Sequence, residues 1–582
     1  MYSQFFIRKR SGTYAETLEA FGVAILVNEI LERSAVGGRK ITIEDKGLQY
    51  LVTTNRSITN EMLDNLGYFQ IIKFLIKDNN TVVPSGIAQS ECFDYPSQKA
   101  EHDHYKGLYD KIEKDNALSS EHKRKARKEL AERKISEFGV KTDVEYDVYR
   151  ELIKNPYASF IKLYSNLSEN QNRFPGLVRE VLRYYAELPI TDREYKLTEE
   201  KPTAQQLLNP NQGKGLNRNK ADSASMGNLN GSWISETMKI SGALQMMTVQ
   251  YLKVGSGYDL KVYVPEFCNI RLSEGLRLII EFKRHLKGAS PIKLDVLNLL
   301  NLIIKFIERT PEYNKGKVKN TIRGFHSVYQ KDLGQNKAVA NIAFVSTPDF
   351  VAYNNKEEGR EWITILEEQR NIIASIEEQG DSIQGLQNYR SFLGSSGTTA
   401  LQYFAHFNYW YAGYLMQAID REKYYVKPFK TEILTKFYTY MDSRLSEIIH
   451  NEGFQSVAQA IRKSTVTLQY TPKESRRFGI RYGLAQQLQN KSKSKVDLAT
   501  FIGEFVGTYN AETARSAEKN NGQAFRANVK DTELLQFYEL LDNFPPRLIG
   551  ALLTSYGFAL TKKETPPEAV ANGEDTEIET IN

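Results

Sequence analysis

The most regular hydrophobic pattern lies near the C-terminal end of the chain, between Met441 and Lys563. Apolar residues recur there at helical spacing in four successive segments. The four sets are Ile480, Leu484 and Leu488; Phe501, Phe505 and Tyr509; Leu534, Leu535, Tyr538 and Leu541; and Ile549, Leu552, Leu553 and Tyr556. Helix starts are marked by Thr471-Pro472-Lys473-Glu474, by Asp497 and by Asp531, and a helix end by Gly557. The pattern predicts a bundle of helices.

Cations gather on the predicted outer face of this bundle. The first turns of the first predicted helix carry Arg476, Arg477 and Arg481, which lie outside its apolar stripe. In the turn to the second helix are Lys491, Lys493 and Lys495. A phosphate backbone could reach these side chains, so the pattern indicates nucleic-acid binding. The plainer interpretation is a solvated helix face.

The first two hundred residues alternate between helix and strand patterns. Helical spacing runs from Tyr14 to Arg33. Strand-like segments follow at residues 40–43, 49–53 and 69–75. From Gln98 to Lys141 the chain is dense in alternating Lys, Arg, Glu and Asp, which is typical of exposed helices. Helical periodicity returns between Val148 and Leu188.

A long polar stretch runs from Thr203 to Ser232 and is rich in Asn, Gly, Ser and Lys. Because it has few aliphatic residues, it cannot bury a core, and we predict a loop that is either functional or disordered. Trp233 marks the return to regular structure, and two strands, near residues 250–253 and 261–264, are expected to form a hairpin with its turn at Gly255-Ser256-Gly257.

A largely helical region is expected from Ser273 to the tail, interrupted by one strand at residues 340–346. The whole chain is therefore predicted to be α+β, with a mixed N-terminal and central α/β region followed by a C-terminal α-helical bundle. The predicted domains are an α+β domain at 1–100, a charged helical region at 101–200, the polar loop and a mixed region at 201–350, a helical region at 351–440, the basic bundle at 441–563 and a disordered acidic tail at 564–582.

Composition narrows the class of protein. The 582 residues carry a formal net charge of +6, which permits a polyanionic partner without requiring one. Two cysteines, Cys92 and Cys268, supply neither a disulfide framework nor a four-cysteine zinc site. No apolar run approaches the roughly 20 residues that span a bilayer. We expect a cytoplasmic protein without membrane, metal or cofactor.

Few residues are arranged for catalysis. Asp259 followed by Glu281 and Lys283 echoes the PD-(D/E)xK pattern of metal-dependent nucleases, in which the carboxylates hold a divalent ion and the lysine orients water. The apolar residues around Glu281 fit a helix as well as a strand. His102-Asp103-His104 lacks the distant partners that a metal phosphohydrolase needs, and no phosphate-binding glycine loop is present. We predict that the chain is not an enzyme, with the nuclease as the alternative.

Aromatic residues crowd the segment from Tyr403 to Tyr414. Such rings can stack on nucleic-acid bases, but their helical spacing favours a place in the core.

Several segments resemble the large subunit of the type I CRISPR effector complex Cascade, in particular its subtype I-B-like branch. Near the N-terminus these are SGTYAETLEAFGVAILVNEIL and ITIEDKGLQYLV, and in the centre GSWISETMKISGALQ. In the C-terminal bundle they are FGIRYGLAQQLQN, DLATFIGEFVGTYNAE and LLDNFPPRLIGALLTSYGFAL. The resemblance is patchy but reaches every third of the chain.

The resemblance implies a non-catalytic subunit that reads the protospacer-adjacent motif, aids duplex opening and R-loop stabilisation, and recruits another protein. Candidate residues for reading the motif lie in the polar stretch: Asn217, Arg218, Asn219, Lys220, Asn228, Asn230 and Ser232. The six cations of the bundle would bind the nucleic-acid backbone.

The implied partners are guide RNA, target double-stranded DNA, the backbone and 5′-handle-binding subunits of Cascade, a small subunit, and either a helicase-nuclease or a transposition adaptor. In some I-B relatives the small subunit comes from an internal start, and Met441 stands just before the bundle.

Overall fold

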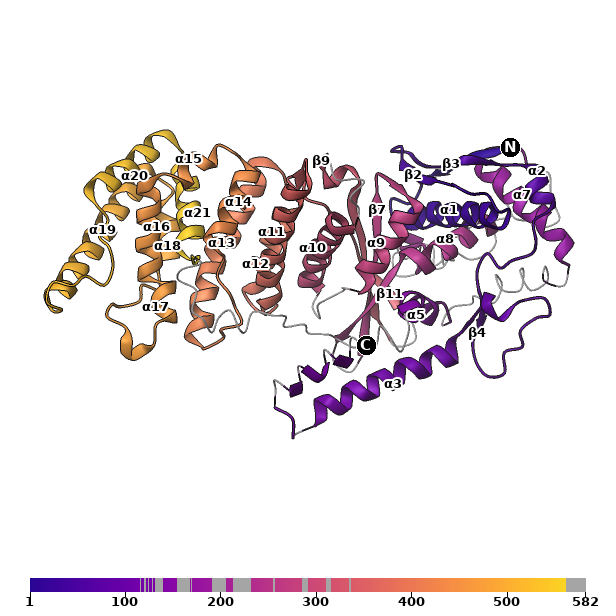
Figure 1. The fold of residues 1–582 in the computed structure, drawn as a ribbon, viewed down its shortest axis with the longest axis horizontal. Coiled ribbons are helices and arrows are strands. Elements are labelled where there is room, and N and C mark those ends of the chain that lie inside the picture. Colours follow the sequence, from indigo (N-terminus) through magenta and orange to yellow (C-terminus); the bar gives the residue numbers. More distant parts are fainter. Residues whose placement is uncertain are drawn as a thin grey trace, which may run out of the picture. The chain divides into compact units, whose positions relative to one another are not determined.

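A computed structural model describes most of the chain (Figure 1). The described residues are 1–115, 140–153, 170–190, 206–212, 232–254, 257–284, 291–309, 316–333 and 337–561, together with 117–119, 122, 123, 125–127, 129, 130 and 168. They form two compact units. The first is built from Met1–His285 and Asn320–Ser346, and the second from Leu286–Lys319 and Thr347–Glu579.

The first unit contains two antiparallel four-stranded sheets. One has the strand order β1-β3-β2-β8 and the other β11-β10-β7-β6. The strands are β1 Tyr2–Arg8, β2 Ile41–Asp45, β3 Gln49–Ile58, β6 Thr248–Val254, β7 Gly257–Phe267, β8 Asn269–Arg271, β10 Ile322–Asp332 and β11 Lys337–Ser346, with a short parallel pair of β4 Phe74–Ile76 and β5 Cys92–Asp94. The helices are α1 Ala15–Arg33, α2 Asn60–Asp64, α3 Tyr95–Lys114, α5 Val140–Ile153, α7 Phe174–Tyr185, α8 Trp233–Met246 and α9 Leu272–Arg284.

Helices α1 and α8 cross with their backbones almost in contact. A Cβ atom added to Gly22 would lie 1.9 Å from the carbonyl oxygen of Met238, and one added to Gly242 would lie 1.9 Å from that of Leu18. Only glycine allows so close an approach. The pair forms the centre of the first unit, because α1 also contacts β1, β2 and β3 and is buried along most of its length.

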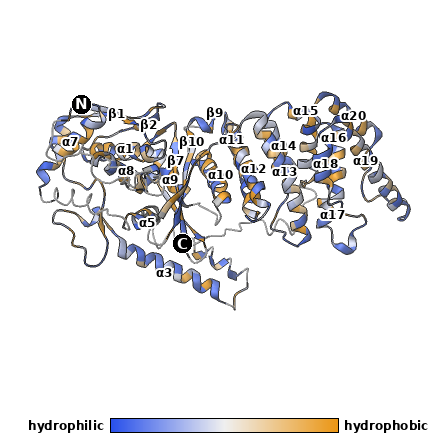
Figure 2. Ribbon diagram, turned by 180° about the vertical axis from the view of Figure 1, so that it is seen from behind, coloured by the Kyte–Doolittle hydropathy of each residue, from blue (hydrophilic) through white to orange (hydrophobic). Residues whose placement is uncertain are grey.

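Helix α3 is the charged helix expected from the sequence. Its buried residue is Tyr105, and Figure 2 shows the helix as mostly hydrophilic along its length. Two side chains fix its N-terminal half, since Tyr95 and His102 both stack on Tyr146 of α5.

The second unit is a stack of helices, as Figure 1 shows. Its described residues also form one short two-stranded sheet. The helices are α10 Pro291–Arg309, α11 Lys356–Ser375, α12 Ser382–Leu393, α13 Gly397–Asp420, α14 Thr431–Met441, α15 Leu445–Ile449, α16 Glu452–Ser464, α17 Val466–Tyr470, α18 Leu484–Lys491, α19 Lys495–Glu518, α20 Asp531–Asn543 and α21 Pro546–Gly557, and the strands are β9 Gly316–Lys317 and β12 Ala352–Tyr353. Phe404, Phe407 and Tyr411 of α13 are buried, so these rings of the aromatic segment belong to the core.

The α+β prediction is confirmed, because the described residues combine several sheets with many helices and end in a C-terminal helical region. The predicted helix at 14–33, the hairpin of β6 and β7 and the strand at 340–346 are present. Three predictions are wrong. Of the strand expected at 69–75, residues 69–73 are irregular, and β4 begins only at Phe74. Residues 322–332, expected to be helical, form β10, and the helix expected to begin at Thr471 does not form there. After a short 3₁₀ turn at Lys473–Ser475 the chain is irregular as far as Gly483, and α18 begins at Leu484.

Among the described residues, no helix is both long enough and apolar enough to cross a membrane.

Candidate nucleic-acid interface

A buried arginine lies at the centre of the bundle's cationic region. The side chain of Arg526 is 3% exposed, and its guanidinium lies 3.7 Å from the ring centre of Phe478 and 3.8 Å from that of Tyr509. It donates hydrogen bonds to Thr513 Oγ1 at 2.8 Å and to Glu512 Oε2 at 2.9 Å. Planar stacking with charged hydrogen bonds is the geometry that arginine favours when it is buried.

Glu512 binds a second arginine on its other oxygen. Arg481 Nη2 donates to Glu512 Oε1 at 2.8 Å, and the Arg481 guanidinium lies over the Phe505 ring. Partial burial would raise the pKa of the Glu512 carboxyl, but the hydrogen bonds from Arg526 and Arg481 outweigh it and lower the pKa below its ordinary value. We call Arg481, Glu512 and Arg526 the arginine cluster. It ties the irregular segment before α18 to α19.

The two other predicted arginines differ from one another. Arg476 donates to the backbone oxygens of Thr471 at 2.9 Å and Gln469 at 3.0 Å, so its side chain holds the irregular segment in place. Arg477 is exposed and stacks on the Phe525 ring at 3.5 Å. Of the three arginines predicted to bind phosphate, Arg476 and Arg481 thus have protein partners, while Arg477 presents its charge to solvent.

The lysines of the α18–α19 turn also separate into two kinds. Lys495 pairs with Asp542 of α20. Lys491 and Lys493 are exposed, and neither has an ion-pair partner in the part of the chain that the structure describes. We call Lys491 and Lys493 the lysine pair. They stand next to the N-terminus of α19, where Ser494 caps the helix and the helix dipole adds partial positive charge.

Contacts of Ser492 hold the turn that carries the lysine pair in place. Ser492 is buried between the two lysines and donates to the backbone oxygen of Gln489 at 3.2 Å. Its hydroxyl oxygen also lies 3.4 Å from the hydroxyl oxygen of Tyr409 on α13. A Cβ atom on Gly550 of α21 would lie 2.4 Å from Ser492 Cβ, so the turn rests closely on that helix.

The charge of the bundle as a whole is nearly balanced. Residues 441–561 contain 15 Lys and Arg against 12 Asp and Glu. Any attraction for a polyanion must therefore come from the local arrangement of unpaired cations.

The residues predicted to read the DNA motif belong mostly to a part of the chain outside the described residues. Asn217, Arg218, Asn219, Lys220, Asn228 and Asn230 all lie there. Ser232 is described, and it is the N-cap of α8, where its hydroxyl accepts a hydrogen bond from Ser235 N at 3.1 Å. Its side chain therefore has a role in the fold.

A buried polar network joins the two ends of the segment 213–231. Asn209, which precedes the segment, donates to both carboxylate oxygens of Glu236, at 3.1 and 2.9 Å. Lys239 Nζ donates to Asn209 Oδ1 and to Glu236 Oε1, both at 2.8 Å. Burial alone would lower the pKa of the Lys239 ammonium, but the carboxylates of Glu236 and Glu19 outweigh it and raise the pKa. We call Asn209, Glu236 and Lys239 the anchor network.

Two further contacts hold the same part of the chain against the residues just before α1. Tyr14 donates its hydroxyl to the backbone oxygen of Leu207 at 2.6 Å, and Asn211 Nδ2 donates to the backbone oxygen of Ser11 at 3.0 Å. Sequence reasoning missed the anchor network, because Glu236 and Lys239 have the spacing of an ordinary exposed helix pair.

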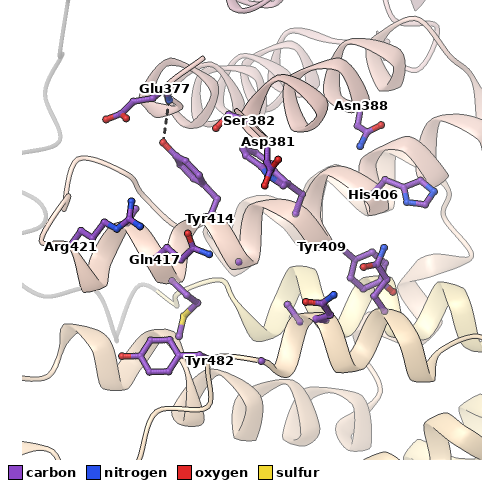
Figure 3. A pocket seen from close by; sticks show the side chains of 18 of the residues that line it. Glu377, Asp381, Ser382, Asn388, His406, Tyr409, Tyr414, Gln417, Arg421 and Tyr482 are labelled. Carbon is purple, nitrogen blue, oxygen red and sulfur yellow. Dashed lines mark hydrogen bonds between the residues drawn. The ribbon is translucent and has the colours of Figure 1, made fainter. Parts of the chain in front are cut away.

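A polar groove of about 760 Å³ lies along α13, between α12 on one side and α18 on the other. Figure 3 shows Gln417 of α13 and Arg421, the residue that follows this helix, with Glu377 and Asp381 on one side and Tyr482 on the other. Other amide and aromatic residues of the lining are Gln379, Asn388, Tyr409, Trp410, Tyr414, Gln486 and Gln489. The sequence signal was the row of aromatic residues on α13, some of which face this groove rather than the core.

The nuclease candidates are not arranged as that pattern requires. Glu281 and Lys283 lie on helix α9, not on a strand. Asp259, on strand β7, accepts hydrogen bonds from the Tyr329 hydroxyl and from Asp332 N. Asp103, from the histidine-containing motif, pairs with Lys99 on the same helix. Within the described parts of the chain, no three His, Cys, Asp or Glu side chains form a group that could hold a metal ion.

Comparison of the sequence with models of known protein families gives no match. Comparison with curated proteins gives none either.

Proposed function

We propose that this chain is the non-catalytic large subunit of a type I CRISPR Cascade of the I-B-like branch. In this role it acts in the cytoplasm, recognises the protospacer-adjacent motif in target DNA, supports duplex opening and the R-loop, and recruits a downstream helicase-nuclease or transposition adaptor. Its partners are guide RNA, target DNA and the other Cascade subunits. The proposal starts from the resemblance of the sequence segments, and the geometry supports it in three places.

The observation that carries the proposal is the anchor network. It fixes both ends of the Asn-, Lys- and Arg-containing segment 213–231 at one place, the N-terminus of α8. Amide and guanidinium groups read base edges in a DNA groove more tightly when their backbone is anchored, since an unanchored loop loses more conformational entropy on binding. A polar segment with buried polar anchors at both ends suits that task better than a simple linker.

The α1–α8 pair gives a second, independent support. The segments around Gly22 and Gly242 both carry the resemblance, and they lie more than 200 positions apart in the sequence. In the first unit they meet backbone to backbone, next to the anchor network. Family-like segments that meet beside the anchor network are what a motif-reading domain would require.

The third support is the lysine pair, which presents unpaired positive charge beside a helix N-terminus. Such a site attracts phosphates irrespective of base sequence. It would give the subunit affinity for the backbone, while the loop would supply the choice of motif.

The first test is affinity purification of the tagged chain from its operon, with mass spectrometry of proteins and sequencing of bound RNA. Recovery of repeat-flanked guide RNA with backbone subunits is the expected result. Recovery of the chain without RNA would contradict the proposal.

The same experiment tests the internal product. A peptide beginning at Met441 would lack α13, whose Asn408 donates to Ser555 Oγ of α21 at 2.9 Å. It would also lack most of α14, whose Tyr438 hydroxyl lies 2.7 Å from the same oxygen. If such a peptide is found, the face of its α21 that carries Ser555 must therefore pack against another surface.

A second experiment separates motif reading from backbone binding. The double variant Asn228→Ala, Asn230→Ala should lose discrimination between flanking motifs by about 1–3 kcal/mol per lost base contact. The matched variant Lys491→Gln, Lys493→Gln should weaken every target to a similar degree. Equal losses on all motifs from the asparagine variant would sink the assignment of the loop.

A further inference from the structure

A strongly acidic segment follows the bundle, beyond Thr561 and outside the described residues. Residues 564–582 contain six carboxylates and no cation. The carboxylates are Glu564, Glu568, Glu574, Asp575, Glu577 and Glu579. We call residues 564–582 the acidic tail. Its side chains carry a charge of −6, whereas residues 441–561 have 15 Lys and Arg against 12 Asp and Glu, so the tail and the bundle are of opposite sign.

The structure fixes the place where the chain leaves the bundle toward this tail. Leu560 N donates to the backbone oxygen of Phe429 at 2.9 Å, and Thr431 N donates to the backbone oxygen of Leu560 at 3.0 Å. The chain is thus held at the start of α14, three positions past Gly557, where α21 ends. The tail therefore starts from a defined point on the bundle.

The lysine pair lies beside α21, the helix that precedes the tail. Ser492, between the two lysines, would have its Cβ 2.4 Å from a Cβ atom on Gly550 of α21. Arg547 lies one turn before Gly550 on the same face of this helix, is exposed, and has no ion-pair partner in the described part of the chain. The lysine pair and Arg547 thus place unpaired positive charge beside the N-terminal half of α21.

The tail is long enough to reach these cations. Gly550 lies at most about 20 Å from Leu560, since seven helical positions and three extended ones join them. The densest acidic stretch, residues 574–579, has four carboxylates in six positions. From Thr561 to Glu574 the chain advances 13 positions, which can span up to about 45 Å. The acidic stretch can therefore return along α21 to the lysine pair.

Cations closer to the start of the tail suit it less well. Lys436 on α14 is already paired with Glu361 at 2.7 Å. Lys430 is exposed, but the exposed carboxylate of Glu432 lies two positions further on and would repel the tail. An acidic segment therefore meets more unbalanced positive charge at the lysine pair and Arg547 than at the start of α14.

We infer that the acidic tail binds back on the lysine pair and Arg547, where it takes the place of a nucleic-acid phosphate. The inference rests on the proposed function in one respect, because the phosphate that it displaces belongs to the DNA bound by the subunit. A segment of the same chain competes at an effective concentration of about millimolar, so a few weak ion pairs suffice. Because the tail opposes only contacts to the DNA backbone, it makes binding depend more on the motif.

The first test needs no DNA. A carbodiimide joins a carboxylate to a lysine amine in contact with it, and mass spectrometry of the treated full chain identifies the joined peptides. Links from Lys491 or Lys493 to residues 574–579 are expected at low salt and should be lost at high salt. Links to Lys430 in their place, or none from the tail, would overturn the inference. Mixing with an isotope-labelled chain identifies links between two copies, which would overturn it as well.

The second test measures duplex DNA binding by fluorescence anisotropy over a range of salt concentrations. The tail variant is the full chain with four carboxylates replaced by amides: Glu574→Gln, Asp575→Asn, Glu577→Gln and Glu579→Gln. At low salt it should bind about threefold to tenfold more tightly than the wild type, the range for two exposed ion pairs, and the gain should fade as salt rises. Combined with Lys491→Gln and Lys493→Gln, the same change should give a smaller gain, because its binding site on the bundle is reduced.

The matched control removes the same charge from exposed positions of the bundle. Its substitutions are Glu447→Gln, Glu504→Gln, Glu518→Gln and Glu539→Gln. If the control gains as much affinity as the tail variant, net charge and not a bound tail determines the effect, and the inference is wrong. If neither the wild type nor the tail variant binds DNA, the proposed function fails, while the carbodiimide links still show whether the tail binds the lysine pair.

Discussion

The arginine cluster and the lysine pair both belong to the segment from Arg481 to Arg526, yet they lie in opposite environments. Arg481 and Arg526 converge on Glu512, and Arg526 is stacked between two aromatic rings. Lys491 and Lys493 are exposed on a turn that other residues hold in place. The first set stabilises the bundle, and the second is available to a ligand.

The difference shows that positive charge in a sequence has two separate uses. A guanidinium keeps its charge when buried, stacks on rings and donates to several acceptors, so arginine can tie segments together inside a fold. An ammonium is strongly hydrated and tends to remain in solvent. In this bundle the lysine pair is accordingly the better candidate for phosphate binding, and the predictions below test that division.

The largest expected effect is on stability, from Arg526→Ala. The change removes two ring contacts and the hydrogen bonds to Thr513 and Glu512 from a buried position, and it should lower the free energy of unfolding by about 3–5 kcal/mol. Chemical denaturation of the full chain measures this. Arg526→Lys retains the charge without the planar guanidinium, so its free energy of unfolding should lie between those of the wild type and Arg526→Ala. A loss below 1 kcal/mol would mean that the cluster does not hold the bundle together.

The second effect is on DNA affinity, from Lys491→Gln combined with Lys493→Gln. At moderate salt the variant should bind duplex DNA on the order of tenfold more weakly, with a salt slope smaller by roughly one for each lysine. Its stability should change by no more than about 0.5 kcal/mol, as is usual for surface positions.

The double variant Lys356→Gln, Arg360→Gln on α11 removes the same charge from exposed positions elsewhere in the second unit. If it weakens binding as much as the lysine variant does, net charge and not the lysine pair determines affinity.

Sequence patterns predicted most of the elements because amphipathic helices and hairpins signal themselves locally. Strand β10 was missed for a physical reason. It lies between β11 and β7 and is buried on both faces from Gly324 to Ser327, so the alternation that marks a half-buried strand is absent. Likewise Thr471-Pro472-Lys473-Glu474 has a helix-start signature, but Arg476 and the Phe478–Arg526 contact hold the following residues in an irregular path.

The candidate site was only partly predictable. The sequence located the cations of the bundle, but whether an arginine meets Glu512 or solvent depends on contacts between residues about 30 positions apart. The groove depends on α13 and α18, which lie more than 60 residues apart, and a single sequence gives no signal of that pairing.

The third effect is on the pH dependence of stability, through Glu512. Its folded pKa is lowered from an ordinary value of 4.5, so the stability it contributes is present above pH 4.5 and is lost as the pH falls through the lower, folded pKa. Glu512→Gln should therefore be less stable than the wild type at neutral pH, by about 1 kcal/mol after solvent screening. The difference should narrow in acid. Thermal unfolding of both proteins from pH 7 to pH 3 measures this difference in stability. A difference that stays constant would mean that the ionisation of Glu512 does not contribute to stability.

The smallest effect concerns Lys495, which lies between the two classes because it is exposed and also paired with Asp542. Exposed pairs contribute little, so a double-mutant cycle with Lys495→Gln and Asp542→Asn should give a coupling energy of about 0.5 kcal/mol or less. The effect on DNA should be asymmetric. Asp542→Asn frees the Lys495 ammonium beside the lysine pair and should strengthen duplex binding and steepen its salt slope, whereas Lys495→Gln should change both only slightly. Unchanged binding by Asp542→Asn would show that the phosphate-binding surface ends at Lys493, because a third cation released at the start of α19 would then lie beyond the reach of the DNA backbone.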